Sequence, residues 1–282
     1  MTTLRDKVCL VTGGASGIGR AIALAWAREG ATVVVSDLAA AAAGGEDTVA
    51  QVRAAGAEAM FVAADVSRDA DCAALVAKTL ERFGRLDAAC NNAGVGGTIA
   101  PTADYALDEW HRVLSVNLTG VFLCMKHEIP ALLASGGGAI VNIASILGAV
   151  GFAGAPAYTA AKHGVLGLTK VAALDYAARG VRVNAIGPAF IHTPMIAGME
   201  GDPATLQALE ALHPAGRLGH PEEVAELVAW LSSARASFVN GATGRSTAAS
   251  WPAERAPAGR HGRDDRRVHF AGSRTACGLS ST

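Results

Sequence analysis

The segment Tyr158-Thr-Ala-Ala-Lys162 places a phenol and an amine four residues apart. Side chains at this spacing share one face of a helix, so the ammonium can lie close to the phenol. A phenol with an ordinary pKa of about 10 is a poor base at neutral pH, and a fixed positive charge nearby stabilises the phenolate. Alone, such a pair is more often an ordinary helix-surface pair. With Ser145 at the end of a predicted strand to donate a hydrogen bond to a substrate oxygen, it predicts acid–base chemistry on a hydroxyl or carbonyl group.

A glycine-rich turn points to a second function, the binding of a dinucleotide. Thr12-Gly-Gly-Ala-Ser-Gly-Ile-Gly19 follows an apolar strand and opens directly into a helix. Its glycines let the backbone approach a pyrophosphate, and the helix N-terminus supplies amide donors. A lone glycine triplet is weak evidence, but the strand–turn–helix context favours this interpretation. We therefore expect cofactor contacts from Gly13, Ser16, Gly17, Ile18 and Gly19.

Asp37 ends the second predicted strand, 18 residues after Gly19. A carboxylate at this place can accept hydrogen bonds from the adenosine ribose hydroxyls and would repel a 2′-phosphate. Positions 14–16 and 38 hold no arginine or lysine to offset that repulsion. The sequence therefore predicts NAD (NADH), with NADP disfavoured, although the alternative of a solvated loop aspartate stays open.

Two further polar turns follow strand ends, Asp65-Val66 and Asn91-Asn-Ala-Gly94. The carboxyl ends of strands form the edge at which doubly wound sheets bind ligands. Each turn could be an ordinary one, but together they lie along a single cleft. Cofactor contacts are expected from Asp65, Val66, Asn91, Ala93 and Gly94.

The elements that must position these groups alternate along the chain. Their strands are apolar throughout, which is typical of a parallel sheet covered on both faces by helices. Repeated β-α-β units with right-handed crossovers predict an α/β fold, a doubly wound, mostly parallel sheet of the Rossmann type in a single domain. The expected strands are Val8–Val11, Thr32–Ser36, Glu58–Ala63, Leu86–Asn91, Ala139–Ile143 and Val181–Ile186; the expected helices are near 17–29, 46–55, 69–83, 108–134 and 156–179.

Composition argues against several other classes of protein. The 282-residue chain is 51% hydrophobic and has a formal net charge of −1, so no general attraction to nucleic acid or anionic membrane is expected. Five cysteines without a CxxC pair indicate buried free thiols, neither disulfides nor a metal site. The N-terminus has no signal-peptide pattern, and the apolar window 138–157 is interrupted by polar residues and glycines. We expect a cytoplasmic protein without a metal.

The ordered set of motifs resembles the short-chain dehydrogenase/reductase family over residues 5 to about 241. The resemblance rests on Thr12–Gly19, Asp37, Asp65-Val66, Asn91–Gly94, Asn117, Ser145, Tyr158, Lys162 and Gly187-Pro188. It implies an NAD(P)-dependent alcohol dehydrogenase or ketoreductase in which Tyr158 is the acid–base group and Ser145 orients the carbonyl. Lys162 would lower the pKa of the tyrosine and hold the nicotinamide ribose. Asn117 would support a kinked helix and a water in the proton relay.

The resemblance also implies hydride transfer at the B face of nicotinamide and a homo-oligomer, a tetramer or dimer. One departure is Pro188-Ala189, where the family usually has Pro-Gly; Pro188, Ile191 and Thr193 are still expected to contact the cofactor. Residues 190–218 are expected to cap an apolar pocket for a hydrophobic or cyclic secondary alcohol or ketone. A 3-oxoacyl thioester is the alternative substrate, and a non-catalytic or inactivated NAD-binding protein the alternative function. His163 and His213 are interpreted as structural, whereas His192 stays open.

The character of the chain changes after the domain expected at 1–241. Residues 242–282 contain seven arginines and no lysine, and Arg245-Ser-Thr-Ala-Ala-Ser-Trp-Pro252 stands where the family ends a last strand with Val-Asp-Gly-Gly. With suitable synonymous codons, a shift of two bases turns this segment into Val-Asp-Gly-Gly-Phe-Leu-Ala. We hypothesise a frameshift near Ala242 that leaves a partly disordered tail, an exposed sheet edge and lowered stability. Resequencing that finds no insertion or deletion relative to related genes would remove the hypothesis.

Overall fold

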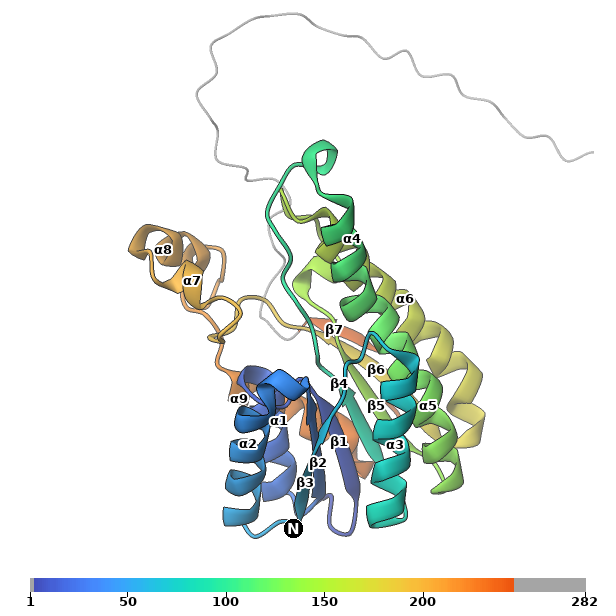
Figure 1. The fold of residues 1–282 in the computed structure, drawn as a ribbon. Coiled ribbons are helices and arrows are strands. Elements are labelled where there is room, and N and C mark those ends of the chain that lie inside the picture. The colour runs from blue at the N-terminus through green and yellow to red at the C-terminus, as the bar shows by residue number, and fades with distance from the viewer. Residues whose placement is uncertain (1–2, 246–282) are drawn as a thin grey trace, which may run out of the picture. The chain divides into compact units, whose positions relative to one another are not determined.

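The computed structural model describes residues 3–245, which form one seven-stranded parallel sheet (Figure 1). The strand order is β3-β2-β1-β4-β5-β6-β7, so the chain reverses its direction of travel between β1 and β4. This is the doubly wound arrangement that the sequence predicts. The strands are β1 (Val8–Thr12), β2 (Thr32–Asp37), β3 (Ala59–Ala63), β4 (Ala88–Asn91), β5 (Gly138–Ile143), β6 (Val181–Gly187) and β7 (Thr243–Arg245).

Helices cover both faces of the sheet, with α1, α2 and α9 on one side and α3, α5 and α6 on the other (Figure 1). Two small helices, α7 and α8, project from the segment after β6. The helices are α1 (Gly17–Arg28), α2 (Ala42–Ala54), α3 (Asp69–Phe83), α4 (Leu107–Leu114), α5 (Gly120–Ala134), α6 (Pro156–Tyr176), α7 (Ala197–Glu200), α8 (Pro203–Ala211) and α9 (Pro221–Ser232). In the described part of the chain, no helix is long and apolar enough to cross a membrane.

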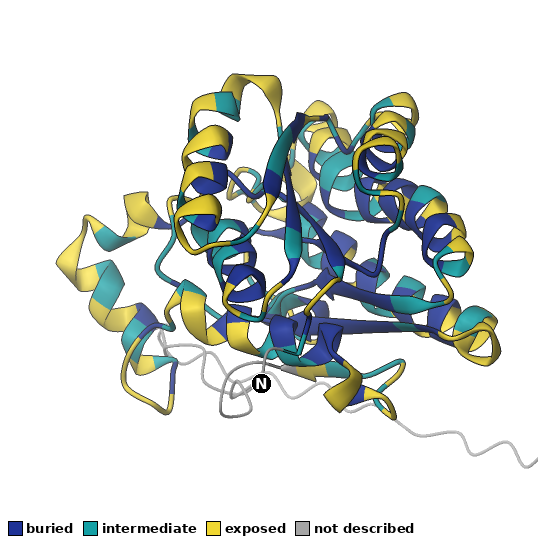
Figure 2. Ribbon diagram, turned by 90° about the horizontal axis from the view of Figure 1, so that it is seen from below, coloured by how far each residue is buried: buried dark blue, intermediate teal, exposed yellow. Residues whose placement is uncertain are grey.

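Strand β1 shows why apolar strands suit this fold. Cys9 and Val11 point into the cluster beneath α1 and α9, whereas Val8 and Leu10 point into the cluster beneath α3 and α5. Successive side chains of a strand face opposite sides, so a strand buried on both faces must be apolar at every position. Figure 2 shows the strands buried and the outer helix faces exposed. The four described cysteines are buried free thiols, as the sequence predicts.

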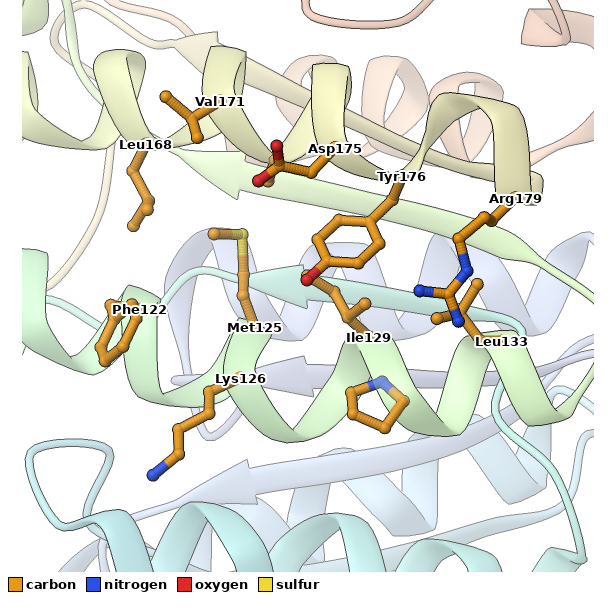
Figure 3. Close-up of a pocket in the computed structure, with 12 residues that line it drawn as sticks. Phe122, Met125, Lys126, Ile129, Leu133, Leu168, Val171, Asp175, Tyr176 and Arg179 are labelled. Atoms are coloured by element: carbon orange, nitrogen blue, oxygen red, sulfur yellow. The ribbon is translucent and has the colours of Figure 1, made fainter.

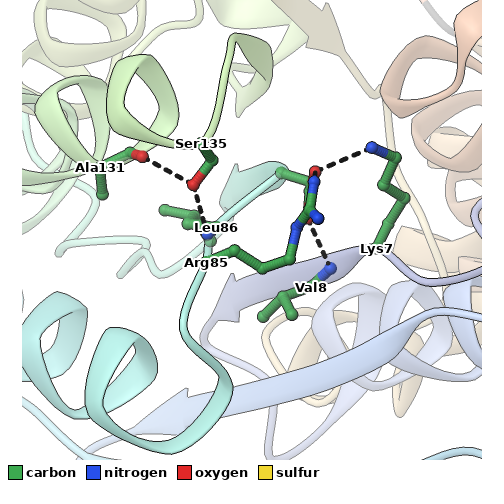
Figure 4. Close-up of polar contacts among 7 residues, drawn as sticks. Lys7, Val8, Arg85, Leu86, Ala131 and Ser135 are labelled. Atoms are coloured by element: carbon green, nitrogen blue, oxygen red, sulfur yellow. Dashed lines mark hydrogen bonds and ion pairs between the residues drawn. The ribbon is translucent and has the colours of Figure 1, made fainter.

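At the amino ends of the strands, a buried carboxylate, Asp87, holds the sheet together. It accepts hydrogen bonds from Lys7 Nζ at 3.0 Å, the Val8 amide at 3.0 Å, and Arg85 at 2.6 and 2.7 Å. Figure 4 shows these donors beside β1 and α5. Although burial acts to raise the pKa of Asp87, the bonds from Arg85, Val8 and Lys7 hold that pKa below its usual value. The clamp fixes β1 against the start of β4.

Four features differ from the sequence-based expectations. The helix expected over 108–134 is interrupted by a single π-helical turn, Ser115–Thr119. Helix α2 begins at Ala42, earlier than expected, and helices α7 to α9 were not predicted.

The outer edge of β6 is not left bare: Gly241 and Ala242 bond with Val183 and Ala185, and the short β7 pairs with residues 185–187. The expectation of an exposed edge is therefore wrong at this point, because residues 239–245 cover it. The predictions about residues 246–282 lie outside the described part of the chain.

Candidate active site

A cleft of about 500 Å³ runs along the carboxyl ends of the strands, beside the reversal point between β1 and β4. The glycine turn forms its floor. Gly13 has a φ of +66° and Gly17 a φ of +51°, conformations that favour glycine. A Cβ on Gly13 would lie 2.9 Å from Ala93 Cα, and one on Gly19 only 2.1 Å from the Gly13 oxygen. This close packing fixes the turn, and the first amides of α1 are left as donors for a phosphate group.

Asp37 stands at the end of β2, on the wall of this cleft. Its carboxylate accepts hydrogen bonds from the Ala15 amide at 3.0 Å and from the Leu38 amide at 2.8 Å. The carboxylate is thus tied to the glycine turn itself, in the place where a ribose of a bound dinucleotide would lie. The donor set and the shape of the turn fit a nicotinamide dinucleotide.

The turn after β4 is locked to the glycine turn by a residue that the sequence analysis passed over, Asn92. Its side-chain amide donates to the Thr12 oxygen at 2.9 Å and to the Gly13 oxygen at 3.2 Å. In return, the Thr12 hydroxyl accepts from the backbone amides of Asn92 and Ala93 at 3.1 Å. The two turns therefore behave as one rigid floor.

The catalytic candidates from three different elements come together at one end of the sheet. Ser145, just after β5, hydrogen-bonds with the phenol of Tyr158 near the start of α6. The Lys162 ammonium lies 5.5 Å from the centroid of the Tyr158 ring, as the spacing of four residues predicts. Lys162 is 3% exposed, and its Nζ donates to the Ile143 oxygen at 2.8 Å.

The pKa of Tyr158 moves against the sequence-based expectation. Burial raises the pKa of the phenol above its usual value, and the hydrogen bond with Ser145 opposes this shift. Burial also lowers the pKa of Lys162 to about 8. Lys162 is not among the groups that shift the pKa of Tyr158 here, so its expected effect on the phenol stays a prediction.

Asn117 occupies the π-helical turn and is fully buried. Its Oδ1 accepts from the Val95 amide at 2.9 Å, and its Nδ2 donates to the Val95 oxygen at 2.7 Å. A Cβ added to Gly94 would lie 2.8 Å from Asn117 Oδ1 and 3.8 Å from Lys162 Nζ. Gly94 therefore lies where the cleft meets the candidate catalytic residues. A π-turn of this kind often marks a functional site.

Several predicted cofactor residues are placed elsewhere. Asn91 is 2% exposed, and its side chain bonds to Glu128 and Asn142 behind the sheet instead of facing the cleft. Ile191 packs into the core beside Gly219. Pro188 is buried, and its carbonyl accepts from the Ile146 amide at 2.9 Å, which supports the Ser145 loop. Gly19 lies beneath the turn. These residues shape the cleft without lining it.

Of the other predicted cofactor contacts, Tyr158 and Lys162 are not part of the cleft lining. The rest do line it: Gly13, Ser16, Gly17, Ile18, Asp37, Asp65, Val66, Ala93, Gly94 and Thr193. Sequence reasoning missed several others, of which Arg112, Ser115 and Val116 lie just before Asn117. The π-turn brings this stretch to the cleft, and no motif announces such a turn. The other missed residues are Thr12, Ser36, Leu38, Ala64, Ser67, Asn92, Val95, Pro194 and Met195.

The segment after β6 folds over the cleft as a lid, which we define as residues 190–218. A Cβ on Gly17 would lie 3.3 Å from Thr193 Cγ2, so the lid crosses the glycine turn. Alanine at position 189 is accommodated, since Asp6 is the only non-glycine residue with positive φ between residues 3 and 245. His192, left open by the sequence, bonds to Glu200 at 2.8 Å and stacks on His220.

His213 joins the two ends of the lid. Its Nδ1 donates to the Leu209 oxygen at 2.7 Å, and its Nε2 accepts from the Phe190 amide at 3.3 Å. The Phe190 ring packs edge-on between His213 and Phe152, with centroid distances of 5.9 and 6.4 Å. An aromatic wall therefore joins the loop before Tyr158 to the lid.

Comparisons with known proteins agree with this geometry. A family model described as enoyl-(acyl carrier protein) reductase matches residues 13–245. Cyclohexanol dehydrogenase from Acinetobacter sp. (strain SE19) is 47% identical over 236 residues, 84% of this chain and 91% of that protein. The short chain dehydrogenase/reductase astE of Aspergillus oryzae is 40% identical over 245 residues, 86% of this chain and 93% of that protein.

Solved structures give the same assignment. The crystal structure of levodione reductase has a TM-score of 0.82 at 40% identity, covering 86% of this chain and 96% of that one. Other structures with the same fold contain NAD+ or NADP. The chain therefore belongs to the short-chain dehydrogenase/reductase family, as an oxidoreductase that interconverts secondary alcohols and ketones.

Proposed function

We propose that this oxidoreductase uses NAD and acts on a hydrophobic, cyclic secondary alcohol or the corresponding ketone. The observation that carries the proposal is the meeting of Ser145, Tyr158 and Lys162 beside Gly94, at the end of a cleft whose floor suits a dinucleotide. The similarity to cyclohexanol dehydrogenase supports a ring-shaped substrate. Four buried free thiols suit a reducing compartment, so we place its action in the cytoplasm.

A nicotinamide dinucleotide held in this cleft would supply the hydride-transfer chemistry. During alcohol oxidation, the Tyr158 phenolate takes the hydroxyl proton while the carbinol carbon gives up its hydride. During ketone reduction, the phenol returns a proton to the carbonyl oxygen. Ser145 Oγ donates a hydrogen bond to that oxygen and so stabilises the charge that develops there. Lys162 supplies positive charge beside the phenol, and Asn117 fixes the loop at Val95.

The aromatic wall and the lid support an apolar ring as the substrate. Phe152 and Phe190 meet edge to face, and beside Phe190 the lid buries a cluster of Ile196, Leu209 and Leu218. Apolar surfaces with few polar groups are typical of sites for hydrophobic small molecules. A 3-oxoacyl thioester remains the comparison substrate, and the similarity to cyclohexanol dehydrogenase does not favour it.

The substrate proposal is tested by following NADH absorbance with a matched set of alcohols and ketones. Cyclohexanol and substituted cyclohexanols should turn over with a higher kcat/KM than linear secondary alcohols of equal carbon number. A 3-oxoacyl thioester reduced faster than any cyclic ketone would overturn the substrate class. Binding of NADH without turnover of any substrate would overturn the enzymatic proposal itself.

The preference for NAD is carried by Asp37, whose carboxylate would face a 2′-phosphate. Replacing it by serine (Asp37→Ser) should reduce the NAD-over-NADP ratio of kcat/KM by about 10- to 100-fold, since like charges brought together are costly. Asp65→Asn, which changes another carboxylate of the cleft wall, serves as the control. A wild-type enzyme that uses NADP as well as NAD would contradict this part of the proposal.

We also propose that the chain is a homo-oligomer joined through α5 and α6. A groove of about 600 Å³ lies between these helices, lined by apolar side chains such as Met125, Ile129 and Leu168 (Figure 3). Phe122 and Val171 in its lining and the adjacent Leu174 are 48%, 55% and 83% exposed, so they form an exposed apolar patch. Leu174→Asp should lower the mass measured by light scattering. A wild-type monomer would contradict the proposal.

A further inference from the structure

A chain of buried polar side chains crosses the otherwise apolar layer between the sheet and helices α5 and α6. Asn91 Nδ2 donates to Glu128 Oε2 at 3.1 Å and to Asn142 Oδ1 at 3.0 Å. Asn142 Nδ2 in turn donates to Thr169 Oγ1 at 2.9 Å. All four side chains are at most 2% exposed. We call this set, Asn91, Glu128, Asn142 and Thr169, the polar chain.

Glu128 is the member of the polar chain whose burial costs the most free energy. Its Oε1 has no hydrogen-bond partner within the described residues, and neither has Asn91 Oδ1. Burial raises the pKa of Glu128 to about 7, against a weaker opposing bond from Asn91, so the carboxyl is mostly neutral below that pH. Leu132, four residues further along the helix, shows that this face of α5 otherwise holds apolar residues. An apolar residue here would be as stable or more so, which argues that the carboxyl serves something other than stability.

The polar chain ends next to both halves of the active site. Asn91 precedes Asn92, which holds the carbonyls of the glycine turn. Asn142 precedes Ile143, whose carbonyl anchors the Lys162 ammonium at 2.8 Å. Thr169 lies on α6, the helix that carries Tyr158 and Lys162. A shift of the polar chain would therefore move the cofactor floor and the lysine anchor together.

We propose that Glu128 is a positioning residue for hydride transfer: it holds Asn91 and, through Asn91, Asn142, and so positions the cofactor turn and the carbonyl that anchors Lys162. It is not a catalytic residue, since it is buried away from the cleft. The inference rests on the proposed function for its activity readout. Its structural readout is independent of turnover.

The test compares Glu128→Gln with Glu128→Leu. Glutamine keeps a neutral group that accepts from Asn91, so kcat should stay within about twofold of the wild type. Leucine removes the acceptor, and kcat should fall by about 10-fold or more with little change in KM, because small misplacements in an active site are costly. The melting temperature of Glu128→Leu should fall no further than that of Ile129→Val, the neighbouring volume control.

Hydrogen exchange measured by mass spectrometry in the protein without cofactor gives the second readout. Glu128→Leu should increase exchange in segments 88–95 and 139–146, whereas Glu128→Gln and Ile129→Val should not. If Glu128→Leu fails to fold, Thr169→Val, which removes the hydroxyl that Asn142 uses, should give a smaller change of the same kind. If the wild type is active and kcat is unchanged in Glu128→Leu, the positioning role is wrong. If Glu128→Leu does not fold, an unchanged kcat in Thr169→Val has the same meaning. Absence of wild-type turnover overturns the proposed function, and unchanged exchange then overturns the positioning role separately.

Discussion

Tyr158 is subject to two opposing influences, burial, which raises the pKa of its phenol, and a hydrogen bond with Ser145, which lowers it. The raised pKa leaves the phenol protonated at neutral pH, the form that ketone reduction needs. Alcohol oxidation needs the phenolate, whose fraction grows as pH rises. We therefore expect the oxidation rate to rise from pH 7 toward pH 9, while the reduction rate does not rise over the same interval. Initial rates measured in both directions across this range check the sign.

Removing the phenolic oxygen tests the same residue directly. Tyr158→Phe should lower kcat by about 10²- to 10⁴-fold, the usual contribution of a positioned acid–base group. NADH binding, measured by fluorescence, should persist because Tyr158 does not line the glycine turn. His163→Leu, an exposed change on the same helix, is the control. Full activity in Tyr158→Phe would remove Tyr158 from the chemistry.

Glu128 gives a prediction about stability at the same scale. Burial raises the pKa of its carboxyl from 4.5 to about 7 in the folded chain. The folded state then holds a proton that the unfolded state releases between these values. The free energy of unfolding should fall by about 3 kcal/mol as pH rises through this window, with the full loss present above pH 7. Burial, with the charge of Glu128, raises the pKa of the Cys90 thiol. The pKa of the Cys124 thiol is raised by its hydrogen bond with Cys72, by burial and by Glu128.

Denaturant unfolding at several pH values measures this loss. The expected slope between pH 5 and 7 should be smaller in Glu128→Gln, whose amide does not titrate. Asp69, an exposed carboxylate whose pKa is lowered by hydrogen bonds from His127 and Lys126, provides the comparison. Asp69→Asn should leave the slope in place, and an equal slope in Glu128→Gln and the wild type would refute the assignment.

Among the elements, the lid depends on a single side chain that uses both ring nitrogens. His213 donates to Leu209 and accepts from Phe190, so it ties helix α8 to the first residue of the lid. His213→Phe keeps an aromatic ring against Phe190 but removes both bonds, each contributing about 1 kcal/mol. We expect KM for a cyclic alcohol to rise about 5- to 10-fold, with kcat little changed. Steady-state kinetics measure this split, and an unchanged KM would show that the lid is held by its apolar cluster alone.

The sequence predicts an element well where burial on both faces requires apolar residues throughout. Strand β1 is apolar at nearly every position because its neighbours in space cover both sides, and the sequence locates it directly. The π-turn at Ser115–Thr119 and the short helices of the lid carry no such pattern. Their conformations come from contacts with distant residues, such as the pairing of Asn117 with Val95.

The same limit applies to the site. Motifs placed Gly13, Asp37, Ser145 and Tyr158 correctly on the carboxyl edge of the sheet, since each has a type and a place that chemistry requires. At the end of β4, the sequence-based prediction assigned the cofactor contact to Asn91 instead of the next residue, Asn92. Alternation along β4 sends Asn91 behind the sheet, and the chain beyond the strand returns Asn92 to the cleft side. Side-chain direction at a strand end depends on the register with β5, which spacing alone does not give.

At the scale of the molecule, the cleft and the stabilising contacts of Asp87 lie at opposite ends of the strands. The carboxyl edge carries the cleft, and the other edge carries the buried Asp87 clamp. The weak point of this arrangement is the end of the strand order, where β7 pairs only three residues with the seven-residue β6. The family model likewise ends its match at residue 245. The frameshift hypothesis makes this outer strand the place where the chain has lost stability.

Restoring the strand puts that hypothesis in measurable form. Replacing residues 245–251 by Val-Asp-Gly-Gly-Phe-Leu-Ala, with the chain ended there, should lengthen the apolar strand beside β6 and add buried surface. We expect a melting temperature at least about 2 °C higher than that of the natural chain, since 1 kcal/mol corresponds to roughly 2–4 °C at this size. A chain ended at residue 245 is the matched control, because it removes the tail without supplying the strand. If the melting temperature of the control rises as much as that of the restored chain, the tail itself lowers stability and the lost strand does not. If neither melting temperature rises, residues 239–245 already close the outer edge and the predicted loss of stability is wrong.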